Sequence, residues 1–187
     1  MKRLISYISI ILVTFLFTAC GGAKYSLTPE QQKIISSNET VYTQVNMWAE
    51  GKRTFGTNFS KGLLIPINTE LKIISVDGKR IVFEYLGAQI NYEVYTKHTQ
   101  LNSEETMSRL FSTKKVDLSK FSKKVQNNIL SGKIAIGMTK DEVLLARGYP
   151  PAHVTIALEV DTWKYWQHRF RTMRVEFKNG KVVNIIK

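Results

Sequence analysis

The chain has almost no cysteine: a single residue, Cys20, in 187. One thiol excludes an intrachain disulfide and therefore a small disulfide-stabilised scaffold. Histidine is also scarce, and none of His98, His153 and His168 has a histidine or carboxylate three or four residues away, as a metal site on a helix would need. The chain has no glycine-rich nucleotide signature and no Gly-x-Ser-x-Gly turn. We therefore expect no metal, no cofactor and no enzymatic activity.

The lone cysteine follows the longest apolar stretch of the chain. Residues 4–19 carry no charge, and Lys2 and Arg3 precede them. This stretch is shorter than the roughly 20 residues that a membrane-spanning helix needs. A basic start, a short apolar segment and small residues at its end are typical of an export signal. We therefore predict that residues 1–19 are a signal peptide.

The residues around Cys20 resemble the lipobox of bacterial lipoproteins, with Thr18 and Ala19 before the cysteine. In such proteins the cysteine becomes the first mature residue and its sulfur carries a diacylglycerol. Acyl chains such as palmitate then make the membrane attachment lasting. Gly21 stands where an Asp would imply retention in the inner membrane. The resemblance thus implies lipidation at Cys20, a tether over residues 20–27 and an outer-membrane protein that faces the periplasm. An ordinary buried cysteine and an uncleaved anchor are the alternatives.

Acidic residues are few in the second half of the chain. Residues 112–187 contain 15 basic and six acidic side chains, whereas residues 20–111 contain ten and nine. A basic half suggests an anionic partner. An exported protein rarely meets nucleic acid, so phospholipid or lipopolysaccharide headgroups and acidic protein surfaces fit better. Simple solvation of the basic side chains is the alternative.

Residues 28–111 have the pattern of a β-rich domain. Thr28 and Gln31 predict a helix start with a capping box. Runs of β-branched and aromatic residues then alternate with glycines, and residues 69–86 have the clearest hairpin pattern. Its Asp77-Gly78 pair favours a type I′ turn. We predict a small antiparallel domain with a barrel-like sheet.

Two helices and three strands are expected in residues 112–187. An apolar stripe predicts the first helix, with Asp117 as N-cap and Gly132 after its end. The stripe consists of Leu118, Phe121, Val125 and Ile129. Thr139 begins the second helix, and Asn179-Gly180 predicts a type I′ turn between the last two strands. The expected class is therefore α+β, with the order helix, helix and three strands in this half.

This order, with its motifs, resembles the SmpA/OmlA (BamE-like) family over residues 117–187. The matching motifs are Gly137-Met138-Thr139, Val143, Gly148-Tyr149-Pro150, Trp163-Lys164-Tyr165 and Phe177-Lys178-Asn179-Gly180-Lys181-Val182. Members of that family are small outer-membrane lipoproteins that support the β-barrel assembly machinery and bind anionic phospholipid. The resemblance implies a two-helix, three-strand domain and a role in outer membrane protein assembly.

A contact surface is expected around the aromatic strand that begins near residue 162. Strand alternation places Trp163 and Tyr165 in the core and turns Trp166 outward, among basic side chains. An exposed indole near cations is common at protein interfaces and at lipid headgroups. The predicted contact residues are Tyr149, Pro150, Trp166, Arg169 and Arg171.

The favoured hypothesis is a lipid-anchored scaffold that binds envelope proteins. Two alternatives stay open. One is a lipoprotein whose β-rich half binds cell wall or another ligand, and the other is a protein inhibitor of a secreted enzyme, since related two-layer folds act in that way.

Overall fold

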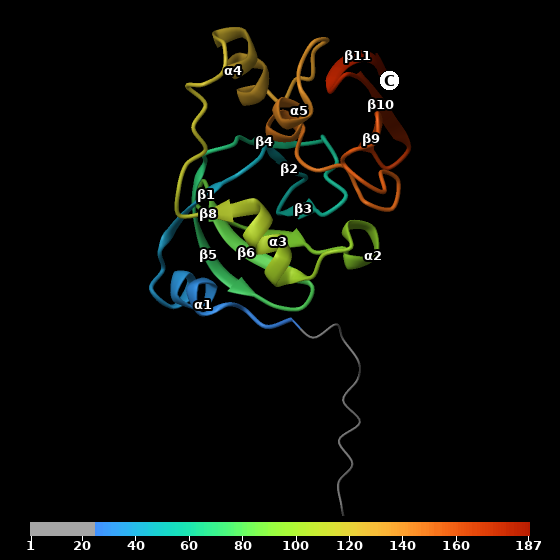
Figure 1. Cartoon of the computed structure of the whole chain (residues 1–187). Coiled ribbons are helices and arrows are strands. Elements are labelled where there is room, and N and C mark those ends of the chain that lie inside the picture. The colour runs from blue at the N-terminus through green and yellow to red at the C-terminus, as the bar shows by residue number, and fades with distance from the viewer. Residues whose placement is uncertain (1–24) are drawn as a thin grey trace, which may run out of the picture.

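Residues 25–187, which this computed structural model describes, form an α+β fold: a β-rich half precedes two helices and a three-stranded sheet (Figure 1). Cys20 and residues 1–19 lie outside the described residues. The first half contains α1 Pro29–Ser36, β1 Thr40–Thr43, β2 Met47–Ala49, β3 Arg53–Phe55, β4 Leu63–Ile65, β5 Glu70–Val76, β6 Arg80–Tyr85, β7 Ala88–Glu93, α2 Thr96–Thr99, α3 Ser103–Leu110 and β8 Phe111–Ser112. The second half contains α4 Lys123–Leu130, α5 Lys140–Arg147, β9 Thr162–His168, β10 Arg171–Lys178 and β11 Lys181–Ile186. The predicted class and the order of elements after residue 117 are confirmed.

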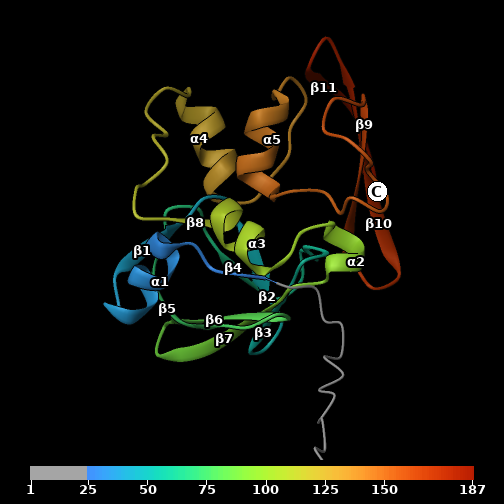
Figure 2. The same ribbon diagram turned by 60° about the horizontal axis from the view of Figure 1, so that its bottom comes forward.

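The β-rich half is built on a six-stranded mixed sheet with strand order β3-β7-β6-β5-β1-β8. Only β3 and β7 pair in parallel; the other neighbours in this sheet are antiparallel. The outer strands β3 and β8 are not neighbours in this sheet, so the predicted barrel-like closure is wrong. The reason lies in α3, whose Met107 and Leu110 belong to the same hydrophobic core as Ile73 and Phe83 of the sheet. The helix covers the apolar face that a barrel would cover by closing on itself. Figure 2 shows α3 on this face, between the sheet and the helices α4 and α5.

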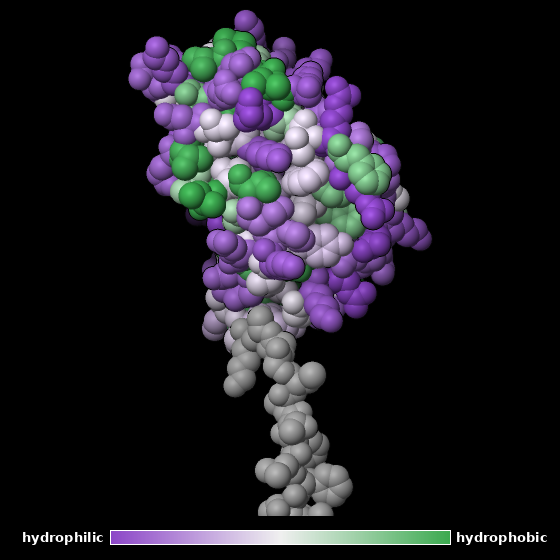
Figure 3. Space-filling model, turned by 90° about the vertical axis from the view of Figure 1, so that its right-hand side faces the viewer, coloured by the Kyte–Doolittle hydropathy of each residue, from purple (hydrophilic) through white to green (hydrophobic). Residues whose placement is uncertain are grey.

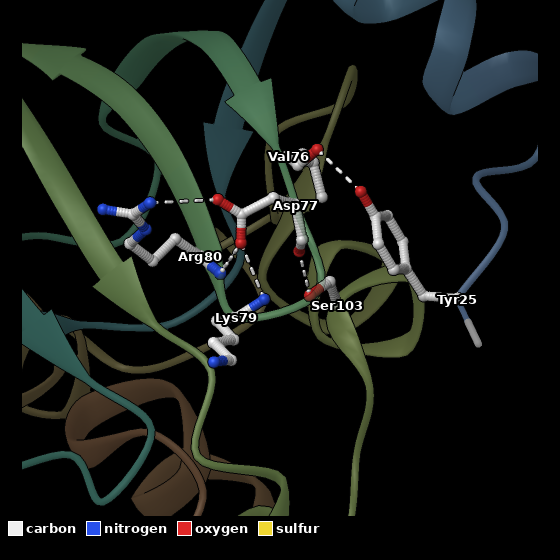
Figure 4. Close-up of polar contacts among 6 residues, drawn as sticks. All are labelled: Tyr25, Val76, Asp77, Lys79, Arg80 and Ser103. Carbon is white, nitrogen blue, oxygen red and sulfur yellow. Dashed lines mark hydrogen bonds and ion pairs between the residues drawn. The ribbon is translucent and has the colours of Figure 1, made fainter. Parts of the chain in front are cut away.

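The predicted hairpin of β5 and β6 forms, but its turn differs from the expected one. Neither Asp77 nor Gly78 has a positive φ, which a type I′ turn requires at both central residues. Instead, the Asp77 carboxylate accepts hydrogen bonds from the backbone N–H groups of Lys79 and Arg80, at 2.7 and 2.9 Å (Figure 4). Local bonding by the aspartate thus fixes the turn.

The same turn is held from two other segments. The hydroxyl of Tyr25 donates to the carbonyl oxygen of Val76 at 3.1 Å, and the hydroxyl of Ser103 donates to that of Asp77 at 2.5 Å (Figure 4). The start of the described chain and the start of α3 are therefore attached to one end of the sheet.

Helix starts in the first half follow the local sequence closely. Thr28 and Gln31 form the predicted capping box of α1. The N-cap of α3 is Asn102, directly before Ser103, and it forms a capping box with Glu105. An asparagine side chain accepts from the third residue of the helix as well as a serine does, so the neighbouring residue takes the role.

The C-terminal half places its two helices on one face of the antiparallel sheet β11-β10-β9. Thr139 and Glu142 form the predicted capping box of α5. The N-cap of α4 is Ser122, so the prediction of Asp117 is wrong. Asp117 bonds instead to the hydroxyl and the backbone N–H of Ser119, which hold the pKa of its carboxyl below the usual range. The turn at Asn179 and Gly180 has the predicted positive φ at both residues.

The two halves are joined through a buried boundary. Ile67, from the loop after β4, belongs to the hydrophobic core of the C-terminal half. Asn46, between β1 and β2, donates to the carbonyl oxygens of Ile129 and Ala146 at 2.5 and 2.8 Å. The side-chain oxygen of Asn46, Oδ1, accepts from the backbone N–H of Ile67 at 2.6 Å. Asn46 is fully buried, so these bonds are made away from water.

Candidate functional site

Two of the five predicted contact residues lie at the boundary between the halves. Pro150 is buried, and Tyr149 is partly buried against the core of the β-rich half. The guanidinium carbon of Arg109, on α3, lies 4.4 Å from the centre of the Tyr149 ring. Both predicted residues line a cavity of only about 30 Å³. Their side chains thus connect α3 to the end of α5, and Pro150 is not available to a partner.

Trp163 and Tyr165 are fully buried, as predicted, but Trp166 is not the exposed indole that strand alternation suggested. It is half-buried, and its ring centre lies 6.4 Å from that of Phe59. The loop between β3 and β4 therefore covers it. The Trp166 Nε1–H is buried and has no hydrogen-bond partner among residues 25–187.

The turn between β9 and β10 carries the remaining predicted residues. Arg169 and Arg171 are exposed, and Phe170 between them is 84% exposed. Phe170 and Arg169 also line an open groove of about 510 Å³ with Phe55, Phe59 and Lys61, among others. Phe170 is not among the predicted contact residues, although an apolar residue between two arginines at a hairpin turn is a signal that marks it.

Figure 3 shows the face on which the C-terminal sheet lies. Hydrophilic side chains dominate this face, and the apolar ones form small separate groups. The apolar side chains on this face therefore do not join into one broad patch.

Two histidines that are 55 residues apart in the sequence meet beside the boundary. The ring centres of His98, in α2, and His153 are 4.4 Å apart, and the backbone N–H of His153 donates to the carbonyl oxygen of His98 at 3.2 Å. Burial lowers the pKa of His98, and the nearby His153 and Lys97 lower it further. Spacing along the sequence gives no sign of this pair, because the contact depends on the tertiary fold.

The most unusual charged group is Arg147, at the end of α5, which is only 6% exposed. Its guanidinium carbon lies 4.7 Å from the centre of the Trp48 ring, and its Nη2 donates to the hydroxyl of Ser60. No carboxylate within residues 25–187 lies within 4.0 Å of it. Burial lowers its pKa to about 10, so it keeps its charge at neutral pH.

The sequence gives no sign of this environment, because an arginine in the last turn of a helix usually points to solvent. The neighbouring Tyr165 hydroxyl donates to the carbonyl oxygen of Gly148 at 3.0 Å, and burial raises the pKa of Tyr165. This tyrosine is therefore neutral and does not offset the charge of Arg147.

No group of three or more histidine, cysteine or acidic side chains is arranged to hold a metal ion within residues 25–187. Over the same residues, no helix combines the length and apolar character needed to cross a bilayer. Comparison of the chain with known family models, curated proteins and solved structures finds no match.

Proposed function

We propose that this protein is an outer-membrane lipoprotein, anchored through acylated Cys20, that binds another envelope protein in the periplasm and does not act as an enzyme. The observation that carries the proposal is the position of the lone cysteine. It follows a charged tip and an apolar stretch, and it precedes the folded chain, whose first described residue is Tyr25, by only five residues.

The shape of the folded part supports this arrangement. Tyr25 is bonded to the β5–β6 turn at one end of the molecule, while α4, α5 and the β10–β11 turn lie at the other end (Figure 1). With an anchor at Cys20, shortly before Tyr25, the β-rich half would lie nearer to the membrane. The C-terminal half would then lie further from it, in the periplasm. That half contains 15 of the basic side chains and six of the acidic ones. The partner we propose is an acidic protein surface, and the resemblance to the SmpA/OmlA family suggests the β-barrel assembly machinery.

The contact surface in this proposal is the β9–β10 turn, defined by Arg169, Phe170 and Arg171. An aromatic side chain that is accessible and lies between two arginines has the composition of an interface hot spot. Trp166 packs against Phe59, and Phe59 lines the same groove as Arg169 and Phe170. In this proposal the indole therefore stabilises the contact surface indirectly. Tyr149 and Pro150 hold the boundary between the halves and take no direct part.

The anchor is tested by metabolic labelling with an alkyne-modified palmitate in a bacterium that processes lipoproteins. The wild-type chain takes up the label and is recovered in the outer membrane, whereas Cys20→Ser remains unlabelled and unprocessed. Equal membrane recovery of both chains without label would contradict the anchor.

The contact surface is tested by photo-crosslinking in cells. Phe170→benzoylphenylalanine is expected to crosslink to an envelope protein, with components of the barrel assembly machinery among the products. Leu86→benzoylphenylalanine is the matched control, because Leu86 is also an apolar residue at a hairpin turn and is 77% exposed. Products at position 86 alone would favour binding through the β-rich half. Crosslinks from position 170 to lipid alone would contradict the proposed protein partner and would show that this turn contacts the membrane surface.

A further inference from the structure

An open cleft of about 660 Å³ lies where the loop between β3 and β4 meets the C-terminal half. Its polar lining consists of Ser60, Lys133, Arg147, Gln167 and Lys187, and none of the residues that line it is acidic. Ile134, Met173 and Ile185 provide apolar lining beside these groups. The cleft therefore combines three basic side chains with an apolar wall.

Arg147 is the deepest of the basic groups and is not neutralised by the protein. It is more than nine-tenths buried, and its Nε–H has no acceptor within residues 25–187. Residues 1–24 contain no Asp or Glu, so they cannot supply a carboxylate from a side chain either. Leaving a buried donor of a charged group without a partner costs more than leaving a neutral one.

Other contacts of Arg147 offset this cost only in part. The Trp48 ring faces its guanidinium, and the C-terminal end of α5 favours a cation. Neither contact provides an acceptor for Nε–H. A planar guanidinium presents donors in a fork that matches two oxygens of one carboxylate or phosphate group.

We propose that this cleft binds a small organic oxyanion, a carboxylate or phosphate that carries an apolar group. The oxyanion pairs with the guanidinium of Arg147, and Lys133 adds charge at the rim. The apolar group packs against Met173 and Ile185. This proposal uses neither the β9–β10 turn residues Arg169, Phe170 and Arg171 nor acylation of Cys20, so it stands even where the proposed anchoring or partner is wrong.

The proposal is tested with four probes: hexyl phosphate, hexanoate, inorganic phosphate and hexanol. Calorimetry is expected to show saturable binding of hexyl phosphate or hexanoate, weaker binding of inorganic phosphate, and none of hexanol. In ¹H–¹⁵N spectra, the Nε–H signal of Arg147 shifts with the same saturation curve. Whichever of hexyl phosphate and hexanoate binds more tightly identifies the oxyanion.

Two variants separate the site from general attraction to a basic protein. Arg147→Gln weakens binding by about tenfold or more, the loss expected for a hydrogen-bonded charge. Lys133→Glu brings a carboxylate to the rim and weakens binding to a similar degree. Lys178→Glu makes the same charge change at an exposed residue outside the cleft and leaves the affinity within about twofold, because surface charges are screened by salt.

Near-ultraviolet circular dichroism checks that each variant keeps its packing. Where Arg147→Gln fails to fold, the pair Lys133→Glu and Lys178→Glu decides alone. The proposal is overturned where no anion binds saturably at millimolar concentration, where hexanol binds as well as the anions, or where Lys133→Glu and Lys178→Glu have equal effects.

Discussion

The side-chain amide of Asn46 donates to the carbonyl oxygen of Ala146 at 2.8 Å, across 100 residues of sequence. The same amide group also donates to the carbonyl oxygen of Ile129. Asn46 thus bonds to residues of both helices of the C-terminal half from a position in the β-rich half. This single buried side chain makes the two halves depend on each other for stability.

Asn46→Ala is expected to lower the free energy of unfolding by about 2–4 kcal/mol, because it leaves the carbonyl oxygen of Ala146 and the backbone N–H of Ile67 buried without partners. Urea unfolding followed by circular dichroism measures the change. Gln44→Ala is the matched control, since its amide also reaches across to the second half, to the carbonyl of Lys114, but in an exposed place. The control is expected to lose less than about 1 kcal/mol. Equal losses for the two variants would show that the buried bonds at Asn46 contribute nothing special.

Gly148, directly after α5, lies at φ +77° and ψ −174°, a region that only glycine occupies readily. A Cβ there would also meet the Asn58 side chain and come within 3.1 Å of the carbonyl oxygen of Asn46. Gly148→Ala is therefore expected to destabilise the fold by about 3 kcal/mol or more, from backbone strain and overpacking together. Gly180→Ala, with φ +71° and nothing near its Cβ position, is expected to cost about 1 kcal/mol. Thermal unfolding of both variants tests this order, and the reverse order would contradict it.

The sequence predicts local features of this fold well. The capping boxes at Thr28 and Thr139 each depend on a residue only three positions further on, so a short window contains all the information. The predicted start of α4 at Asp117 is wrong, and the local sequence pattern also explains this error. The apolar stripe begins at Leu118, but Leu118 and Phe121 pack on the core from a loop, and the helix begins only after Ser122. An apolar stripe shows which residues face the core and does not by itself show where the helix begins.

Features that join distant segments could not be predicted in this way. The parallel pairing of β3 with β7 and the covering of the sheet by α3 depend on the packing of the whole half. The candidate sites have the same origin. Arg147 is unusual only because Trp48 and Ser60, far away in the sequence, enclose it. Trp166 was predicted to be exposed from the alternation of side chains along one strand. That pattern contains no information about the distant loop whose Phe59 covers the indole.

The contact between Trp166 and Phe59 changes which substitution probes binding cleanly. Trp166→Ala removes a half-buried ring and is expected to lower the free energy of unfolding by about 2 kcal/mol. Phe170→Ala removes a ring that is 84% exposed and is expected to change it by less than about 0.5 kcal/mol. Urea unfolding of the two variants checks the difference. A Trp166→Ala chain as stable as the wild type would mean that Phe59 does not depend on the indole.

The partly buried position of His98, beside His153, makes stability depend on pH. The folded-state pKa of His98 lies below its ordinary value of 6.5, first because of burial and then because of His153 and Lys97. The unfolded chain therefore binds a proton more readily than the folded one, and stability falls as the pH drops below about 6.5. Urea midpoints measured between pH 7.5 and pH 5 test this dependence, and His98→Gln is expected to weaken it. His168→Gln, at the end of β9 and outside this pair, is the control and is expected to leave the dependence as it is in the wild type. If His98→Gln has the same pH dependence of stability as the wild type, groups other than His98 cause that dependence.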